Sequence, residues 1–217
     1  MLIAAFKGEI PSHRRPTPPQ PTQDTEAPKA EMPPLRRSES WAPSDEFDNG
    51  VMCFQPRKKE KHWFSGSKSP LSNFFMFDLS FRGKTYKSVE HAYQCMKARS
   101  TQSFKAEQKI LDAPTAARAK LLAKHLNFTA KELDVWKCNR VALMKELLEQ
   151  KYKQCPEFRE ELHAHTGMDL WEATRDDFWA SGLMKFELQA RPNSPLQGLN
   201  VLGYLLMELE IRSTLKM

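Results

Sequence analysis

The chain has 217 residues, and its 33 lysines and arginines outnumber its 27 aspartates and glutamates, which gives a formal net charge of +6. No apolar run approaches the roughly 18 residues that a membrane-spanning helix needs, which excludes a transmembrane protein. The 4 cysteines are widely spaced and form no C-x-x-C pair, which argues against a disulfide framework and a zinc finger.

Residues 1–58 differ in composition from the rest of the chain. They hold 10 of the 15 prolines, and their 8 basic and 8 acidic residues balance. A segment with so few apolar residues cannot offset its ordering entropy, so we predict a disordered, proline-rich tail that is available to bind proteins. The first six residues are too few for a signal peptide, so a cytoplasmic or nuclear location is expected.

Residues 59–217 form the predicted folded domain and carry the whole excess of positive charge. This charge is compatible with an anionic partner, such as a phosphorylated metabolite, ADP-ribose or nucleic acid. It is equally compatible with ordinary solubility charge.

The first half of this domain begins with strand patterns. Residues 62–65 predict a short strand, and residues 77–81 alternate apolar and polar side chains, as a half-buried strand does. A tight turn at 82–84 leads into a return strand. Ser88 is then a suitable N-cap for a helix over residues 89–99, in which Glu90, Gln94 and Lys97 share one polar stripe.

The remainder is predicted to be mostly helical. Helices are expected over residues 102–111 and 114–124, the second with Pro114 in its first turn. A capping box at 129–132 begins a long helix over 130–153, and a further helix runs from Pro156 to about residue 166. Residues 169–182 are predicted to be irregular, and a last helix follows Asn200.

Two carboxylates are candidates for chemistry. Glu90 lies at the second position of a helix, where free N–H groups favour an anion and therefore a base or electrostatic stabiliser. The alternative is a surface glutamate that only stabilises the helix end. Asp176 lies in the acidic, aromatic segment after residue 169, where it is suited to positioning water or a ribose hydroxyl. Its alternative is an Asx-type turn.

Aromatic and basic residues supply candidate binding groups. Phe74, Trp136 and Trp179 are suited to stacking on a flat heterocycle, although core packing is the alternative for each. Four basic residues are candidates for holding a phosphate, with a solvated helix face as the alternative. They are Arg82, Lys97, Lys137 and Arg140.

Metal and nucleotide-binding motifs are absent from the sequence. His163 and His165 are two residues apart, so their rings diverge on a helix, and no third ligand has suitable spacing. No P-loop and no G-x-G-x-x-G are present. Neither a metal nor a cofactor is expected.

Several blocks together resemble one family. They are WFS (63–65), PLSNF (70–74), SVEHAYQ (88–94), Lys97, Trp136 with Met144, Leu170 with Glu172, Asp176 with Trp179, and GLNVLGYLLM (198–207). In order and spacing they are similar to the NADAR (YbiA-like) superfamily over residues 62–212. The resemblance implies an α+β, mainly helical single domain with a small β-hairpin or sheet.

The resemblance also implies chemistry and site residues. Members cleave N-glycosidic bonds, either in ribosylaminopyrimidine phosphates of the riboflavin pathway or in ADP-ribosyl-guanine. The catalytic positions of the family match Glu90 and Asp176. The substrate-binding set that we assign is Asn73, Phe74, Lys97, Trp136, Arg140, Trp179 and Asn200.

One block departs from the family pattern. The family often has Trp-Gly-x-Gly, whereas residues 179–182 here read WASG. Losing the first glycine is expected to stiffen or reshape this loop.

The predicted function is hydrolysis of an N-glycosidic bond in a phosphorylated ribosyl-base compound. One alternative is a hydrolase that removes ADP-ribose from guanine in nucleic acid, which the net charge of +6 favours. The others are a non-catalytic module that binds ADP-ribose or NAD, and a protein-interaction module that acts through the tail.

Overall fold

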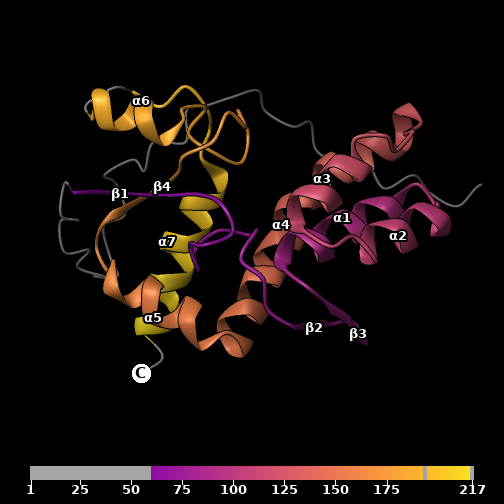
Figure 1. Ribbon diagram of the computed structural model, residues 1–217, viewed down its shortest axis with the longest axis horizontal. Helices are drawn as coiled ribbons and strands as arrows, with labels where there is room; N and C mark the ends of the chain where they lie inside the picture. Colours follow the sequence, from indigo (N-terminus) through magenta and orange to yellow (C-terminus); the bar gives the residue numbers. More distant parts are fainter. Residues whose placement is uncertain (1–59, 193–194, 216–217) are drawn as a thin grey trace, which may run out of the picture. The chain divides into compact units, whose positions relative to one another are not determined.

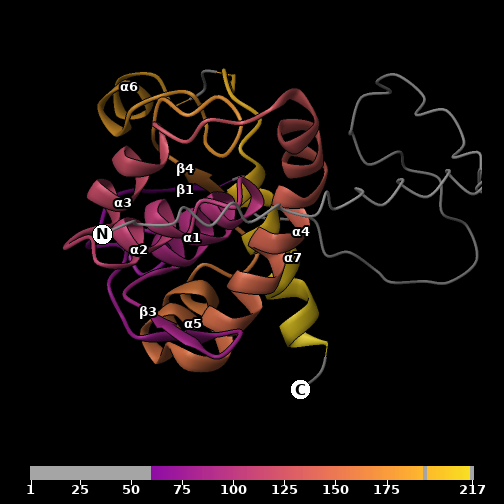
Figure 2. The same ribbon diagram turned by 90° about the vertical axis from the view of Figure 1, so that its right-hand side faces the viewer.

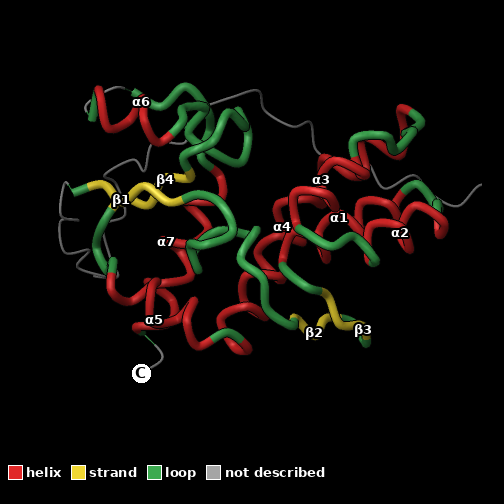
Figure 3. Tube along the Cα trace, viewed as in Figure 1, coloured by secondary structure: helices red, strands yellow, loops and turns green. Residues whose placement is uncertain are grey.

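The computed structural model describes residues 60–192 and 195–215. The predicted tail of residues 1–58 lies outside these residues. Helices dominate the described part, and two short strand pairs lie apart from each other (Figure 3). This arrangement confirms the predicted mainly helical α+β class. Within the described residues, no helix is both long enough and apolar enough to cross a bilayer.

Seven helices follow one another along the described chain. Their bounds are α1 Val89–Ser100, α2 Phe104–Leu111, α3 Ala116–Ala123, α4 Ala130–Gln154, α5 Pro156–Ala164, α6 Lys185–Ala190 and α7 Val201–Thr214. The predicted caps are confirmed for α1 and α4. The Ser88 hydroxyl accepts a hydrogen bond from the His91 N–H, and Thr129 and Glu132 form the reciprocal capping box.

The strands form two separate pairs. β2 Leu79–Phe81 and β3 Lys84–Tyr86 make the predicted hairpin. At its turn, Arg82 and Gly83 both have positive φ angles, of 47° and 75°, which matches the right-handed twist of the strands. β1 Lys61–Phe64 instead pairs in parallel with β4 Asp169–Glu172.

Helix α1 lies at the centre of the fold and contacts α2, α3 and α4 (Figure 1). Its apolar residues Val89, Ala92, Tyr93 and Met96 are buried, as predicted. The polar side chains of Glu90 and Gln94 are buried as well. Burial of a carboxylate and an amide is costly unless each has partners, so this helix is the natural place to look for a site.

The long helix α4 runs beside the C-terminal helix α7 (Figure 2). Near its end, Lys151 is fully buried, and its ammonium group donates a hydrogen bond of 2.7 Å to the carbonyl of Ser72. The same ammonium lies 4.5 Å from the centre of the Phe158 ring. Burial lowers the pKa of Lys151 to about 7. Through this bond, α4 fixes the loop that carries Asn73 and Phe74.

Three sequence predictions about elements were wrong. Residues 169–172 are not irregular but form β4, because they pair with a strand more than 100 residues earlier. Helix α6 lies in a region where no helix was expected. Pro114 lies before helix α3 rather than in its first turn, since Thr115 is the N-cap and accepts a hydrogen bond from the Arg118 N–H.

Candidate active site

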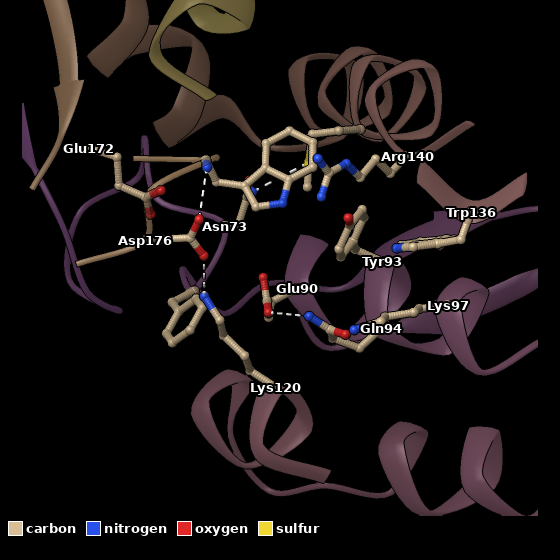
Figure 4. A pocket seen from close by; sticks show the side chains of 13 residues that line it. Asn73, Glu90, Tyr93, Gln94, Lys97, Lys120, Trp136, Arg140, Glu172 and Asp176 are labelled. Atoms are coloured by element: carbon tan, nitrogen blue, oxygen red, sulfur yellow. Dashed lines mark hydrogen bonds and ion pairs between the residues drawn. The ribbon is translucent and has the colours of Figure 1, made fainter. Parts of the chain in front are cut away.

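One cavity collects eight of the nine predicted site residues. It is lined by Asn73, Phe74, Glu90, Tyr93, Gln94, Lys97, Lys120, Trp136, Arg140, Met144, Glu172, Asp176 and Trp179. These residues come from the 69–75 loop, from α1, α3 and α4, and from β4 with the segment that follows it (Figure 4). The cavity therefore lies where segments distant in the sequence meet.

Glu90 lies between Gln94 and the Asp176–Lys120 pair (Figure 4). Its Oε1 accepts a hydrogen bond of 2.8 Å from the Gln94 side chain. Its backbone N–H donates to the carbonyl of Asn73 at 3.1 Å. The 69–75 loop therefore accepts a hydrogen bond from one of the free N–H groups at the start of α1. The Glu90 carboxylate points into the cavity.

The electrostatic setting of Glu90 differs from the prediction. Burial raises the pKa of Glu90, although the nearby Lys120 ammonium and the Gln94 hydrogen bond oppose that rise. The sequence suggested an anion stabilised by the helix end. Desolvation outweighs that effect here, because the side chain is only 5% exposed. The surroundings of Glu90 therefore favour its protonated form more than water does.

Asp176 is the carboxylate that stays ionised. Its Oδ1 accepts hydrogen bonds from the backbone N–H groups of Phe178 and Trp179, and its Oδ2 pairs with Lys120 at 3.2 Å. Burial acts to raise its pKa, but these donors outweigh burial and hold the pKa below the usual range. Asp176 therefore forms an Asx-type turn and also lines the cavity. Since a carboxylate offers about four acceptor positions, one remains for a ligand hydroxyl.

Glu172 is a third acid that the sequence analysis did not assign to the site. It is the last residue of β4. Burial raises its pKa to about 8; the positive charge of Lys120 opposes this rise, and the negative charges of Glu90 and Asp176 add to it. At neutral pH this carboxyl group is mostly protonated. The cavity therefore combines an ionised acid, Asp176, with two buried acids whose pKa values are raised, Glu90 and Glu172.

Three cations also line the cavity. They are Lys97, Lys120 and Arg140. Lys97 and Arg140 were predicted and Lys120 was missed, because nothing on α3 marks it as different from other helix-surface lysines. The guanidinium of Arg140 stacks 3.4 Å from the centre of the Phe178 ring, which fixes its orientation.

The two other predicted phosphate candidates lie elsewhere. Arg82 forms an ion pair of 2.7 Å with Glu146 near the hairpin turn. Lys137 is exposed on α4 and does not line the cavity.

Aromatic rings form one wall of the cavity. Trp136 and Trp179 do not face each other as a clamp, because Tyr93 lies between them, with its ring centre 5.1 Å and 5.6 Å from theirs. Phe178 packs edge-on against Trp179, with ring centres 4.9 Å apart, but does not line the cavity. Tyr93, Trp136 and Trp179 form the aromatic row beside the acids.

Polar atoms that lack a protein partner gather at this cavity. Within the described residues, the buried Oδ1 of Asn73, Oε1 of Gln94 and Nε of Arg140 have no hydrogen bond. Buried polar atoms are rarely left unpaired in folded proteins. Two acceptors and one donor are therefore available to a polar ligand.

Asn200 is the predicted site residue that the structure places outside the cavity lining. Its side chain is buried and makes two hydrogen bonds to the backbone of β4. The Asn200 amide oxygen accepts from the Glu172 N–H at 3.0 Å, and the amide nitrogen donates to the Leu170 carbonyl at 2.9 Å. Both ends of the amide are occupied. Asn200 therefore ties the start of α7 to β4.

The departure at residues 179–182 does not strain the loop. Within the described chain, positive φ angles occur at Gly182 but not at Ala180, so an alanine fits there without penalty. Gly182 is the position that needs a glycine, because a Cβ would lie 2.8 Å from the Gly198 nitrogen. No strained backbone angle therefore arises at Ala180.

Comparison with known proteins identifies the family of this chain. The family model of the NADAR domain matches residues 53–216. The chain belongs to the NADAR domain family. The NMR structure of the E. coli protein YbiA is similar, with a TM-score of 0.57 and 23% identity over 73% of this chain and 88% of that chain.

This structural similarity confirms the YbiA-like fold. A search of curated protein sequences found no significant match. Membership of the NADAR family favours a glycosidase-type function in general terms and leaves the substrate undefined.

Proposed function

We propose that this NADAR domain hydrolyses the N-glycosidic bond of a phosphorylated ribosyl-base compound, such as a ribosylaminopyrimidine phosphate. One observation carries the proposal. The buried Glu90 lies in a single cavity with an aromatic wall and with three cations. These are the groups that a negatively charged, base-bearing sugar needs.

The reaction requires that positive charge at C1′ of the sugar be stabilised while water attacks and the base departs. Glu90 in its ionised form accepts the proton of the attacking water, and its negative charge stabilises the oxocarbenium-like transition state. The C1′–N bond breaks as the C1′–O bond forms. Glu172, which is mostly protonated at neutral pH, gives its proton to the departing nitrogen.

The other groups bind and orient the substrate. The aromatic row packs against the base, and the unpaired Arg140 Nε, with Lys97, meets the phosphate. Asp176 holds Lys120 in place and keeps one acceptor position for a ribose hydroxyl. After turnover, solvent returns a proton to Glu172 and removes one from Glu90.

The substitution Glu90→Gln tests this function. Glutamine keeps the size of the side chain and a hydrogen-bonding oxygen, but it cannot accept the proton of water. We expect the rate to fall by about 10²–10⁴-fold, while binding of ribose 5-phosphate changes by less than about threefold. Product release is measured by chromatography and binding by calorimetry.

The matched control is Glu160→Gln, an exposed glutamate on α5 that should leave the rate unchanged. If Glu90→Gln hydrolyses substrate as fast as the wild type, Glu90 is not the catalytic group. Retained activity in Glu90→Gln together with lost activity in Glu172→Gln would transfer the central role to Glu172.

A second candidate function is removal of ADP-ribose from guanine in nucleic acid. The observation that favours it is the net charge of +6 on residues 59–217. The same assay distinguishes the two when ribosylaminopyrimidine phosphate, ADP-ribosyl-guanine DNA and NAD are incubated in parallel. Release of ADP-ribose from the DNA alone would establish this second function. No product from any of the three would favour the non-catalytic module that binds ADP-ribose or NAD.

A further inference from the structure

A second cluster of functional side chains lies outside the residues that line the cavity. His62 on β1 meets Glu161 on α5 and His165, the C-cap residue of that helix. Each of the three offers one donor atom, and the donor atoms all lie within 4.8 Å of one another. Glu161 and His165 are four residues apart and so share one side of the helix end. We call these residues the His62–Glu161–His165 cluster.

The cluster is held together without hydrogen bonds between its side chains. The Glu161 Oε1 lies 3.9 Å from His62 Nε2 and 3.9 Å from His165 Nδ1, which is beyond hydrogen-bond distance. The rings of His62 and His165 are tilted by 43° to each other, with their centres 3.6 Å apart. Two imidazoles and a carboxylate therefore converge without hydrogen bonds between their side chains.

A hydrogen bond to the backbone orients the ring of His165. The Nδ1 of His165 lies 2.8 Å from the backbone carbonyl of Glu161, and because a carbonyl only accepts, Nδ1 carries the proton. In the neutral ring the lone pair is then on Nε2. A hydrogen bond from the other ring nitrogen to a carbonyl is the usual way in which a ligating histidine is oriented. His163, on the same helix, takes no part in the cluster, since its Nε2 is 2.8 Å from the Tyr152 hydroxyl.

We infer that His62, Glu161 and His165 form a binding site for a divalent transition-metal ion, with Zn²⁺ as the ion that best suits this set. Two imidazoles and one carboxylate are a common zinc ligand set, and a fourth position stays open to water. Ligands of one tetrahedral zinc ion lie about 3.3 Å apart, given bond lengths of about 2.0–2.2 Å. The donor atoms, which lie within 4.8 Å of one another, therefore need to approach by up to about 1.5 Å. The side chains of His62 and Glu161 are 26% and 33% exposed and have room to do so.

The sequence did not reveal this site because His62 lies far from Glu161 and His165 in the chain. His163 and His165 attract attention as a pair, but His163 takes no part. The ligands that complete the set are Glu161, one turn before His165, and His62, which is 103 residues away in the chain. Only the approach of α5 to β1 brings His62 to the other two.

A bound ion would join β1 to the end of α5. Strand β1 pairs with β4, and the chain runs from α5 directly into β4 (Figure 1). The ion would therefore brace the strand that carries Glu172 from a point outside the cavity.

The test is zinc binding by the full chain after removal of metal with a chelator. Zn²⁺ is titrated in competition with a chromogenic chelator, and the melting temperature is measured with and without equimolar Zn²⁺. We expect one ion per chain that depends on the cluster, and a rise in melting temperature. Glu161→Gln and His165→Ala should each weaken binding at least about tenfold and abolish the rise.

The control is His163→Gln, which alters a histidine on the same helix and should bind zinc as the wild type does. Glu161→Gln keeps side-chain size, so it remains informative if a histidine variant fails to fold. Absence of stoichiometric zinc binding by the wild type would overturn the inference. So would zinc affinity that is unchanged in both Glu161→Gln and His165→Ala, because the ion would then be bound elsewhere in the chain.

Discussion

At the scale of single residues, three acids in one cavity differ in the direction in which their surroundings shift the pKa. Asp176 is ionised because backbone N–H groups and Lys120 outweigh its burial, whereas Glu90 and Glu172 are shifted upward by burial. Groups whose environments separate their pKa values are suited to divide acid and base roles between them. The cations of the cavity keep these acids close together without strong repulsion.

The raised pKa of Glu172 predicts a pH dependence of stability. The folded protein binds the proton of Glu172 up to about pH 8, whereas the unfolded chain releases it near 4.5. The free energy of unfolding should therefore be highest below about pH 4.5 for this group and fall as the pH rises toward 8. The slope is at most about 1.4 kcal/mol per pH unit for one proton.

The substitution Glu172→Gln should reduce this slope, because glutamine does not titrate. Urea unfolding at several pH values between 5 and 9 measures it, with Glu160→Gln as the control that keeps the wild-type slope. Some slope should remain, since the pKa of Glu90 is raised as well. Identical slopes in wild type and Glu172→Gln would show that Glu172 is not protonated in the folded protein.

At the scale of elements, Asn200 joins the start of α7 to β4. It has a φ of 50° in the left-handed region, which asparagine tolerates better than most residues. Helix α7 approaches β4 so closely that a Cβ on Gly203 would collide with the Leu170 carbonyl. Together these residues position the strand that carries Glu172.

We expect Asn200→Ala to lower the free energy of unfolding by about 2 kcal/mol or more. The substitution leaves the Glu172 N–H and the Leu170 carbonyl unpaired in a buried place, at a cost of about 1–3 kcal/mol for each group. Urea unfolding measures the change. Leu199→Ala, at a neighbouring side chain that is 60% exposed, should change stability by less than about 0.5 kcal/mol. Equal effects of the two substitutions would contradict the bridging role of Asn200.

At the scale of the whole molecule, the sequence predicted correctly the features that depend on interactions between residues close together in the chain. Local patterns correctly predicted α1, α4 and the hairpin, because caps, spacing and turn residues lie within a few positions of one another. The family resemblance brought eight of nine predicted site residues to the cavity. Lys120 and Glu172 were missed because each becomes part of the site only through long-range packing.

The structural role of Asn200 could not be predicted for a similar reason. Its motif marks the position as important, but the sequence cannot distinguish an amide that contacts a ligand from one that bonds a neighbouring strand. Strand β4 was missed because its partner β1 lies more than 100 residues earlier. Local sequence therefore specified most helices, whereas the site's third acid required the complete fold.

The sealed position of Lys151 has a practical consequence for following motions of this core. Its amine is inaccessible to water in the folded protein, so a reagent in solution can reach it only when the surrounding core opens. Acylating reagents should therefore modify the exposed lysines quickly and Lys151 only when α4 separates from the Ser72 loop. The rate at which mass spectrometry detects a label on Lys151 would then report how often this core opens.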